Sequence, residues 1–221
     1  MVFNGYEKPD YKFCHLIFFS FLLSVTAHAA APTAELKVKG KIGLPTCTIN
    51  APDGGIYNLG EISASQVKSG TAVTVLSSIT KNWTVTCDSL TYLSLTAIDN
   101  RKASVSDSTG IHNFGLGFVN GTGKLGFYKT TMSNATVDGV SSLLYFIDAN
   151  NVLQGGHTLE TLTNNFRFGW SENATTAKAG KVFSADFTVI PTLAGSTAMG
   201  GAITENINID GSTTMNFSFG I

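Results

Sequence analysis

The chain has 221 residues, a formal net charge of −1 and only 13% charged residues. A chain so nearly neutral lacks the basic surface that nucleic acids and anionic membranes attract, so neither is expected as a partner. It has three cysteines and four histidines, with no Cys-x-x-Cys pair, which argues against a metal centre.

Residues 1–29 have the order of a secretory signal peptide. Lys8 and Lys12 precede the apolar run Phe13–Val25, and Ala27-His28-Ala29 supplies a small-x-small cleavage pattern. The run is shorter than the roughly 20 residues that cross a bilayer, so a membrane anchor is the weaker alternative. We therefore expect export, a mature chain that starts at Ala30 or the next residue, and no membrane span in that mature chain.

Residues 30–45 contain a strictly alternating segment. Leu36, Val38, Gly40 and Ile42 share one parity, and every residue between them is a lysine. A period of two predicts a strand with one apolar and one charged edge. Gly40, in the middle of the apolar row, indicates close approach to another backbone or a shallow pocket. We interpret this segment as an N-terminal extension that is donated as a strand to another protein molecule.

Two cysteines remain after the signal peptide, which contains Cys14. Cys47 and Cys87 are an even pair in an exported chain, and one disulfide is the simplest interpretation. Two free thiols are the alternative.

Residues 46–221 are expected to form one all-β domain. Short runs rich in Val, Ile, Thr and Phe recur between turn residues, and long segments of helical period are absent. The expected strands are 46–50, 56–59, 72–79, 82–87, 93–97, 114–119, 124–130, 143–148, 166–170, 181–190 and 207–221. Pro191 is expected to break the tenth of these.

The last run is a half-buried strand with a strict alternation. Met215, Phe217, Phe219 and Ile221 share one parity, and polar residues separate the first three of them. The two cleanest alternating strands therefore lie at the two ends of the mature chain. They are expected to pair, within one molecule or between molecules.

Several patterns imitate catalytic motifs. Gly121–Gly126 matches G-x-G-x-x-G, but a strand is expected after it where a dinucleotide site needs a helix, so a hairpin turn is favoured. His112 and His157 lie in no nucleophile motif and are interpreted as surface loop residues. Asp99-Asn100-Arg101 is interpreted as a turn capped by its own side chains rather than a ligand site. No enzyme activity and no cofactor are expected.

The chain resembles the bacterial fimbrial subunits of the chaperone–usher route, within a less-studied branch of fimbrial-like exported proteins. The resemblance rests on the secretion signal, Gly40 ahead of Cys47, Cys87 directly after Trp83–Thr86, and the alternating aromatic strand at the C-terminus. It spans most of the mature chain. The chain differs from the usual pattern in having Gly220 at the next-to-last position and extra sequence at about 100–165.

The resemblance implies an immunoglobulin-like β-sandwich that is incomplete because its last strand is missing. A periplasmic pilus chaperone would lend that strand, and an outer-membrane usher would exchange it for the extension of another fimbrial subunit, on the way to the cell surface. Leu36, Val38, Gly40 and Ile42 would then be the donor residues. The groove and chaperone-binding residues would be Met215, Phe217, Phe219 and Ile221. The alternative is an exported carbohydrate- or surface-binding module, either adhesin-like or a self-complemented monomer.

Overall fold

The computed structural model describes residues 31–220, so the predicted signal peptide and Ile221 lie outside the described residues. The chain divides into two units, one that ends at Ile42 and one that begins at Gly43. In the first unit, residues 31–42 form no strand, and Lys37 pairs with Glu35 at 3.0 Å. The boundary lies close to the one expected between the extension and the body.

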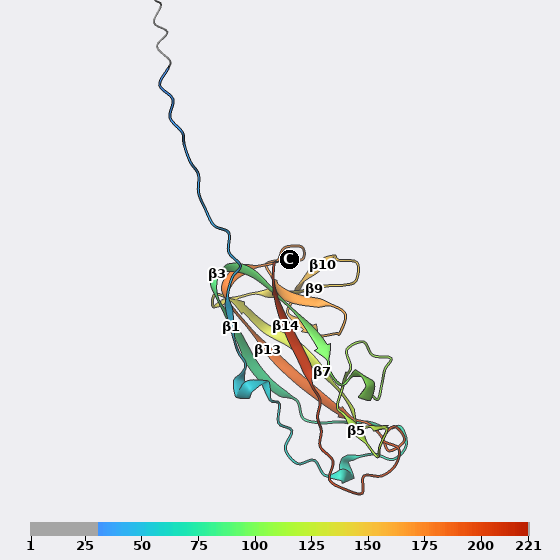
Figure 1. Cartoon of the computed structure of the whole chain (residues 1–221). Helices are drawn as coiled ribbons and strands as arrows, with labels where there is room; N and C mark the ends of the chain where they lie inside the picture. The colour runs from blue at the N-terminus through green and yellow to red at the C-terminus, as the bar shows by residue number, and fades with distance from the viewer. Residues whose placement is uncertain (1–30, 221) are drawn as a thin grey trace, which may run out of the picture. The chain divides into compact units, whose positions relative to one another are not determined.

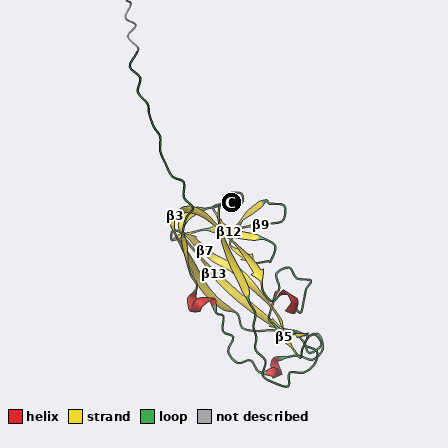
Figure 2. Ribbon diagram, viewed as in Figure 1, coloured by secondary structure: helices red, strands yellow, loops and turns green. Residues whose placement is uncertain are grey.

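The body, from Gly43 onward, is all-β, as the sequence predicts, and forms an immunoglobulin-like sandwich (Figures 1 and 2). Every strand pairing is antiparallel. One layer contains β1 (Cys47–Asn50), β2 (Thr74–Val75), β4 (Phe114–Gly115), β7 (Gly126–Val137), β8 (Val140–Ser141), β11 (Leu159–Thr161) and β13 (Ala179–Leu193). The other contains β9 (Leu143–Ile147), β10 (Leu153–His157), β12 (Arg167–Ser171) and β14 (Thr213–Phe219).

The remaining elements are short. β5 (Phe118–Val119) and β6 (Gly123–Lys124) form a separate hairpin. Three single-turn helices, η1 (Pro52–Gly55), η2 (Ala64–Gln66) and η3 (Lys102–Ser104), lie in connections. Within residues 31–220, no helix is long and apolar enough to cross a membrane.

The strand β3 (Ile79–Asp99) belongs to both layers. Its first part pairs with β13, from Ile79 to Tyr92, and its last part pairs with β14, from Leu93 to Asp99. The sequence predicted two strands here, 82–87 and 93–97, because the polar run between them resembles a turn. The structure joins them into one strand of 21 residues that passes from one layer to the other.

The core lies between the two layers. Trp170 packs against Phe183 with ring centroids 5.2 Å apart, and its indole N–H donates to the backbone carbonyl of Ser184 at 3.0 Å. This hydrogen bond satisfies the polar atom of a side chain that is 2% exposed. Burial of each large apolar side chain stabilises the fold by about 1.5–3 kcal/mol. The other large, fully buried side chains are Tyr145, Phe114, Phe168, Leu93, Leu95, Met132, Leu144, Leu162, Met199 and Val137.

Three of the predicted strands need correction. Residues 56–59 form no strand, and of 72–79 only Thr74–Val75 and the first residue of β3 are paired. The last predicted strand, 207–221, is hydrogen-bonded only over Thr213–Phe219, because β3 ends opposite Thr213. Strand β13, in contrast, continues through Pro191. That residue lies past the end of the β3 pairing, and its carbonyl accepts a hydrogen bond from Leu76.

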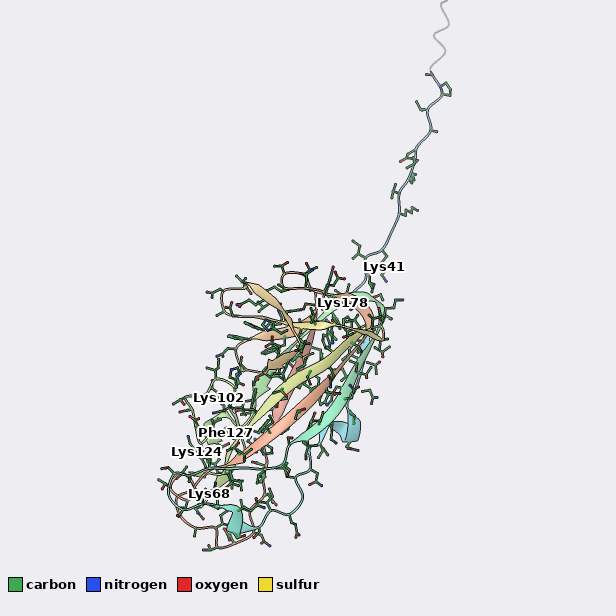
Figure 3. The ribbon with its side chains drawn as sticks, turned by 180° about the vertical axis from the view of Figure 1, so that it is seen from behind. Lys41, Lys68, Lys102, Lys124, Phe127 and Lys178 are labelled. Atoms are coloured by element: carbon green, nitrogen blue, oxygen red, sulfur yellow. A yellow bond between two sulfur atoms is a disulfide. The ribbon has the colours of Figure 1, made fainter. Side chains whose placement is uncertain are left out.

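Lysine side chains of the body are dispersed over its surface (Figure 3). Several of them fasten loops to the sandwich. The ammonium groups of Lys68, Lys124 and Lys178 donate to the backbone carbonyls of Val73, Val105 and Ser141, at 2.9–3.0 Å.

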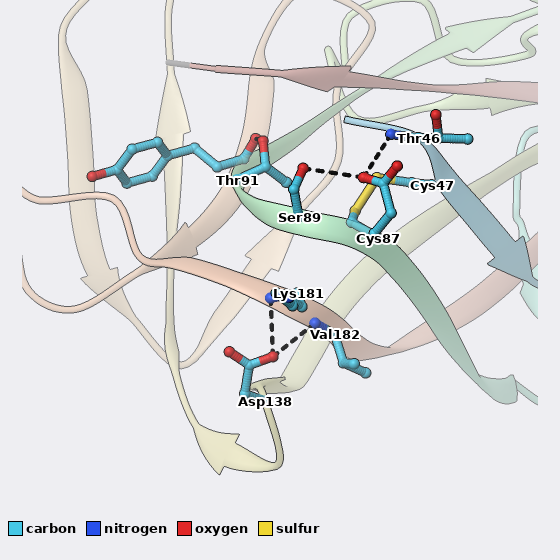
Figure 4. Close-up of a disulfide and its surroundings, with 10 residues drawn as sticks. Thr46, Cys47, Cys87, Ser89, Thr91, Asp138, Lys181 and Val182 are labelled. Carbon is cyan, nitrogen blue, oxygen red and sulfur yellow. Dashed lines mark hydrogen bonds between the residues drawn. A yellow bond between two sulfur atoms is a disulfide. The ribbon is translucent and has the colours of Figure 1, made fainter. Parts of the chain in front are cut away.

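Cys47 and Cys87 form a disulfide, which confirms the predicted pairing (Figure 4). The two residues are directly opposite each other in the β1–β3 ladder, so the bond fastens the first strand to the strand shared by both layers. The Asp88 carboxylate reinforces this end of the ladder by accepting from the backbone N–H of Thr46 at 3.0 Å. A disulfide of this kind indicates an oxidising environment, as met by exported proteins.

A carboxylate also stabilises an irregular point of β13. The register between β13 and β3 shifts between Gly180 and Val182. Asp138 accepts from the backbone N–H groups of Lys181 and Val182 at 2.9 and 2.8 Å (Figure 4). These hydrogen bonds, first that from Val182 and then that from Lys181, lower the pKa of the carboxyl group.

Replacing both Cys47 and Cys87 by alanine should lower the free energy of unfolding by about 3–4 kcal/mol, because the bond closes a loop with a sequence separation of 40. Urea unfolding of the oxidised protein and the double variant measures this difference. Thiol labelling of the denatured, non-reduced exported protein should detect no free cysteine, and full labelling of both residues would contradict the bond.

Candidate functional site

A cavity of about 1,060 Å³ lies on one side of the β1–β3–β13–β7 layer. Small-molecule sites usually measure about 300–1,000 Å³, so this cavity has room for a segment of polypeptide. Its floor is formed by Trp83, Leu116, Leu125, Tyr128, Thr130, Phe187, Val189, Pro191 and Leu193. Its two walls are residues 55–64 with Val67, and residues 203–213 with Met215. We call this cavity the groove.

The floor is apolar because alternate residues of three strands point into the sandwich. Trp83 of β3 and Phe187 of β13 lie with ring centroids 5.5 Å apart. Tyr57, from the first wall, accepts from the Trp83 indole N–H at 3.1 Å and donates to the Phe187 carbonyl at 3.1 Å. Burial is the main cause of the raised pKa of the Tyr57 hydroxyl, so this hydroxyl stays neutral and keeps both hydrogen bonds.

The first wall is an extended segment without a strand partner. Tyr57, Leu59 and Ile62 are half-buried and point toward the floor, while Ile56 is 65% exposed. Within the described residues, no strand is assigned between Gly55 and Thr74. The backbone N–H groups of Ile56 and Gly60 donate to the Asp53 carbonyl and to the Asn58 side chain, at 3.2 and 2.9 Å, and most of the other backbone groups of this wall remain available along the groove.

The second wall is the chain that leads into β14. Ile203, Ile207 and Ile209 are half-buried and pack against the core, and the residues between them are exposed. This continues the parity of β14, although β3 no longer reaches the segment. Its backbone is held near the C-terminal end by the hydrogen bond from Asp210 to the Leu116 carbonyl, at 3.2 Å.

Gly211 allows this wall to approach the floor closely. A Cβ atom at this position would lie 2.9 Å from the Tyr128 ring and 3.2 Å from the Gly115 carbonyl oxygen. The Tyr128 hydroxyl is hydrogen-bonded to the Thr213 hydroxyl, where β14 begins. Tyr128 is 7% exposed, and burial raises its pKa to about 12. A larger residue than glycine would push the second wall away from the floor.

The two edge strands beside the groove have open sides. β1 and β14 pair with β3 and, among the strands of residues 31–220, with no other. Unpaired edges are sites at which another strand can add, through main-chain hydrogen bonds and pockets for alternate side chains. An apolar floor between two walls of unpaired, extended backbone has the geometry that such an added strand requires.

The predicted C-terminal groove residues are only partly brought together. Met215 lines the groove, and Phe217 is half-buried against the core. Phe219 is 43% exposed and is not among the lining residues, and Ile221 lies outside the described residues. Of the four residues, only Met215 lines the groove within the described part of the chain, so the alternation of the sequence does not correspond to one continuous wall.

The predicted donor residues lie in the first unit. Leu36, Val38 and Ile42 are 87%, 90% and 102% exposed, and no atom lies within 4 Å of a Cβ built on Gly40. Their segment forms no strand, and its role as a donor stays a prediction.

Sequence analysis missed Tyr57, Trp83 and Tyr128 as functional residues, because they come together from segments that are far apart in the sequence. The signal for Ile207 and Ile209 was present, since both share the parity of Met215. Two of the motif-like patterns form turns, as predicted. Residues 120–122 turn between β5 and β6, and the Asp99 carboxylate accepts from the Arg101 N–H at 2.8 Å in a turn.

Comparison with known proteins gives one family match. Residues 36–133 are similar to a family described as "Protein of unknown function (DUF1120)". The match covers less than half of the chain, from the extension to the middle of β7. No curated protein matches the chain. The matched part includes the donor segment, the first wall of the groove and the Trp83 and Tyr128 part of its floor.

The buried Tyr128 predicts an alkaline loss of stability. Its folded pKa is raised above the unfolded value of about 10, so its neutral form contributes stability that is complete below pH 10 and is lost as the pH rises toward about 12. Tyr128→Phe should remove this component, worth about 2–3 kcal/mol across that range. Ultraviolet titration of tyrosinate absorbance should show that the substitution removes a transition near pH 12. Loss of a transition near pH 10 would contradict the burial.

Proposed function

We propose that the protein is a structural subunit of a bacterial surface fimbria, assembled by donor-strand complementation. The observation that carries this proposal is the groove, whose apolar floor lies between two walls of unpaired backbone. The groove is the acceptor, and residues 30–45 of a neighbouring subunit are the donor. The function is structural, without catalysis.

The donor matches the groove in chemistry. Leu36, Val38 and Ile42 present apolar side chains on one edge, and burial of each would stabilise the assembly by about 1.5–3 kcal/mol. Each main-chain hydrogen bond to a wall adds about 0.5–1.5 kcal/mol net. Gly40 is expected to lie where the donor strand must approach the groove too closely for a side chain. A strand of this length would hold a fibre together without covalent bonds between subunits.

The groove also explains why a chaperone would be needed. An exposed apolar cavity with two open edges favours aggregation when a subunit is alone. A periplasmic chaperone would cover it with a strand of its own, and an outer-membrane usher would exchange that strand for the extension of the next subunit. The disulfide supports passage through an oxidising compartment on the way to the cell surface.

The donor role predicts the outcome of changes in the extension. Deletion of residues 31–39, or Gly40→Leu, should leave a soluble chaperone–subunit complex but abolish subunit ladders on unboiled gels, because the donor strand is absent or sterically blocked. Lys39→Leu is the matched control for Gly40→Leu, since it adds the same side chain on the opposite edge, and it should retain ladders.

The same deletion tests the alternative of a self-complemented monomer. In that case residues 31–39 would complete their own sheet, and a chaperone-free monomer would lose its thermal stability on deletion. That result would reject the fibre and favour a stand-alone binding module.

The acceptor role predicts a difference between two adjacent residues of β14. Met215→Asp places a charge in the groove, where its desolvation opposes strand addition, whereas Asn216→Asp places one on the exposed side. When each variant is co-expressed with the chaperone, Met215→Asp should yield little co-purified complex and Asn216→Asp a normal amount. Equal yields would count against the groove as the chaperone site. Phe217→Asp should also reduce the yield, because Phe217 packs against the core.

A further inference from the structure

A second cavity lies between the two layers, away from the groove, in the part of the chain with extra sequence. Its volume is about 350 Å³, which is the size of a small ligand site. It shares no lining residue with the groove. The lining residues are Ile111, His112, Phe146, Leu159, Glu160, Thr161, Phe166 and Phe168. We call it the Glu160 cavity.

The carboxylate of Glu160 is the unusual feature of this cavity. Glu160 lies in the middle of β11, opposite Met132, and its side chain is only 10% exposed. Its Oε1 atom is buried and has no hydrogen-bond partner. The Nδ1 atom of His157 lies 3.6 Å from that oxygen, too far for a hydrogen bond, and the His157 side chain is 44% exposed. A buried carboxylate oxygen without a hydrogen-bond donor costs stability, and a ligand that donates to it would remove this cost.

Aromatic rings form the wall beside this carboxylate. Phe146 and Phe166 stack with centroids 5.5 Å apart and an interplanar angle of 13°, and the His157 ring lies 5.7 Å from Phe146. Phe168 closes the inner end and is 1% exposed. Aromatic faces carry negative charge density, which attracts cations.

His112 adds a second acceptor. Its Nδ1 lies 3.2 Å from the Thr161 carbonyl oxygen and 3.3 Å from that of Leu162, so this nitrogen must carry the proton and donate. In the neutral ring, Nε2 is then an acceptor. The lining residues include no lysine or arginine. Arg167 is next to two lining residues in the sequence, but it belongs to the opposite face of its strand.

We propose that the Glu160 cavity binds a small organic cation, an ammonium or guanidinium group on a short apolar stem. The carboxylate and the imidazole accept hydrogen bonds from the charged head, and the phenylalanine rings contact both the head and the stem. The ligand supplies the donors that Glu160 lacks. Burial raises the pKa of the Glu160 carboxyl group and His157 lowers it, and a bound cation would favour the ionised form. This inference stands independently of the groove and its proposed function.

The test is a titration of the exported protein, in complex with its chaperone if the free chain is not soluble, followed by the backbone amide NMR signals of the lining residues. Pentylammonium should give saturable shifts at Ile111, Leu159 and Thr161. Pentan-1-ol, which has the same stem without the charge, should give none. Nα-acetyl-lysine amide distinguishes the source of the cation. If it also saturates the site, a lysine side chain of another protein fits, and if only pentylammonium does, the ligand is a free amine.

Substitutions of Glu160 and Phe166, with Glu172 as a control, test which residues bind the cation. Glu160→Gln should weaken pentylammonium binding by about tenfold or more, since it removes a charge-assisted hydrogen bond. Its melting temperature should be unchanged or higher, because an unpaired buried carboxylate is lost. Glu172→Gln, at an exposed glutamate outside the cavity, should bind as the unsubstituted protein does. Phe166→Leu provides a second test if Glu160→Gln does not fold, and it should weaken binding while preserving the cavity's charge.

Three results would overturn the proposal. They are the absence of saturable shifts with either cation, equal shifts with pentan-1-ol and pentylammonium, and unchanged binding in folded Glu160→Gln.

Discussion

The backbone pairing of β3 is the interaction on which the rest of the body depends. This strand bonds to β13 and β1 in one layer and to β12 and β14 in the other. The disulfide fastens β1 to it at Cys87, and the buried residues Leu93 and Leu95 bring the second layer onto the core. Because one strand serves both layers, loss of its register would separate the sheets and expose the core at once.

The groove follows from where this pairing stops. β1 ends after Asn50 and β14 begins only at Thr213, so the chain that follows β1 and the chain that precedes β14 run along the floor outside any strand pairing. The side chains of these walls still alternate, and their inward residues pack against the floor. The result is a cavity whose apolar floor is partly covered by these inward side chains. The backbone of its walls is mostly without hydrogen-bond partners. That combination favours an added strand over a small ligand, because a strand supplies both apolar side chains and main-chain partners.

The Glu160 cavity has a different chemistry. The groove offers backbone groups and mostly apolar surface, whereas the smaller cavity offers a carboxylate, an imidazole and stacked aromatic rings. Its lining residues come from β9, from β11, from the beginning of β12 with Phe166 before it, and from the loop that contains Ile111 and His112, and none of them lines the groove. A subunit with both features would combine assembly through one cavity with recognition of a small cation through the other.

The sequence by itself determined the fold class, the disulfide and the local strands, because these depend on short-range signals. Short runs rich in Val, Ile, Thr and Phe between turn residues identified β9, β12 and most of β13, and an even pair of cysteines after a signal peptide sufficed for Cys47 and Cys87. Tertiary structure decided which alternating segments are hydrogen-bonded to a neighbouring strand and which have no strand partner. Residues 207–212 and Thr213–Phe219 share one pattern, yet only the second segment is a strand, since β3 extends only that far.

The residues of the two candidate sites also differ in how far the sequence predicts them. Met215 was predictable from its parity, but Trp83 and Tyr128 reach the groove floor from strands more than 40 residues apart, through pairing that no local pattern contains. Glu160 has no sequence signal at all, because a single glutamate in a short polar run is expected to be exposed. Its burial arises only when β11 pairs with β7 and the facing layer places Phe146 and Phe168 over it. Local alternation specifies which way a side chain points, and only the packing of distant strands specifies what it meets.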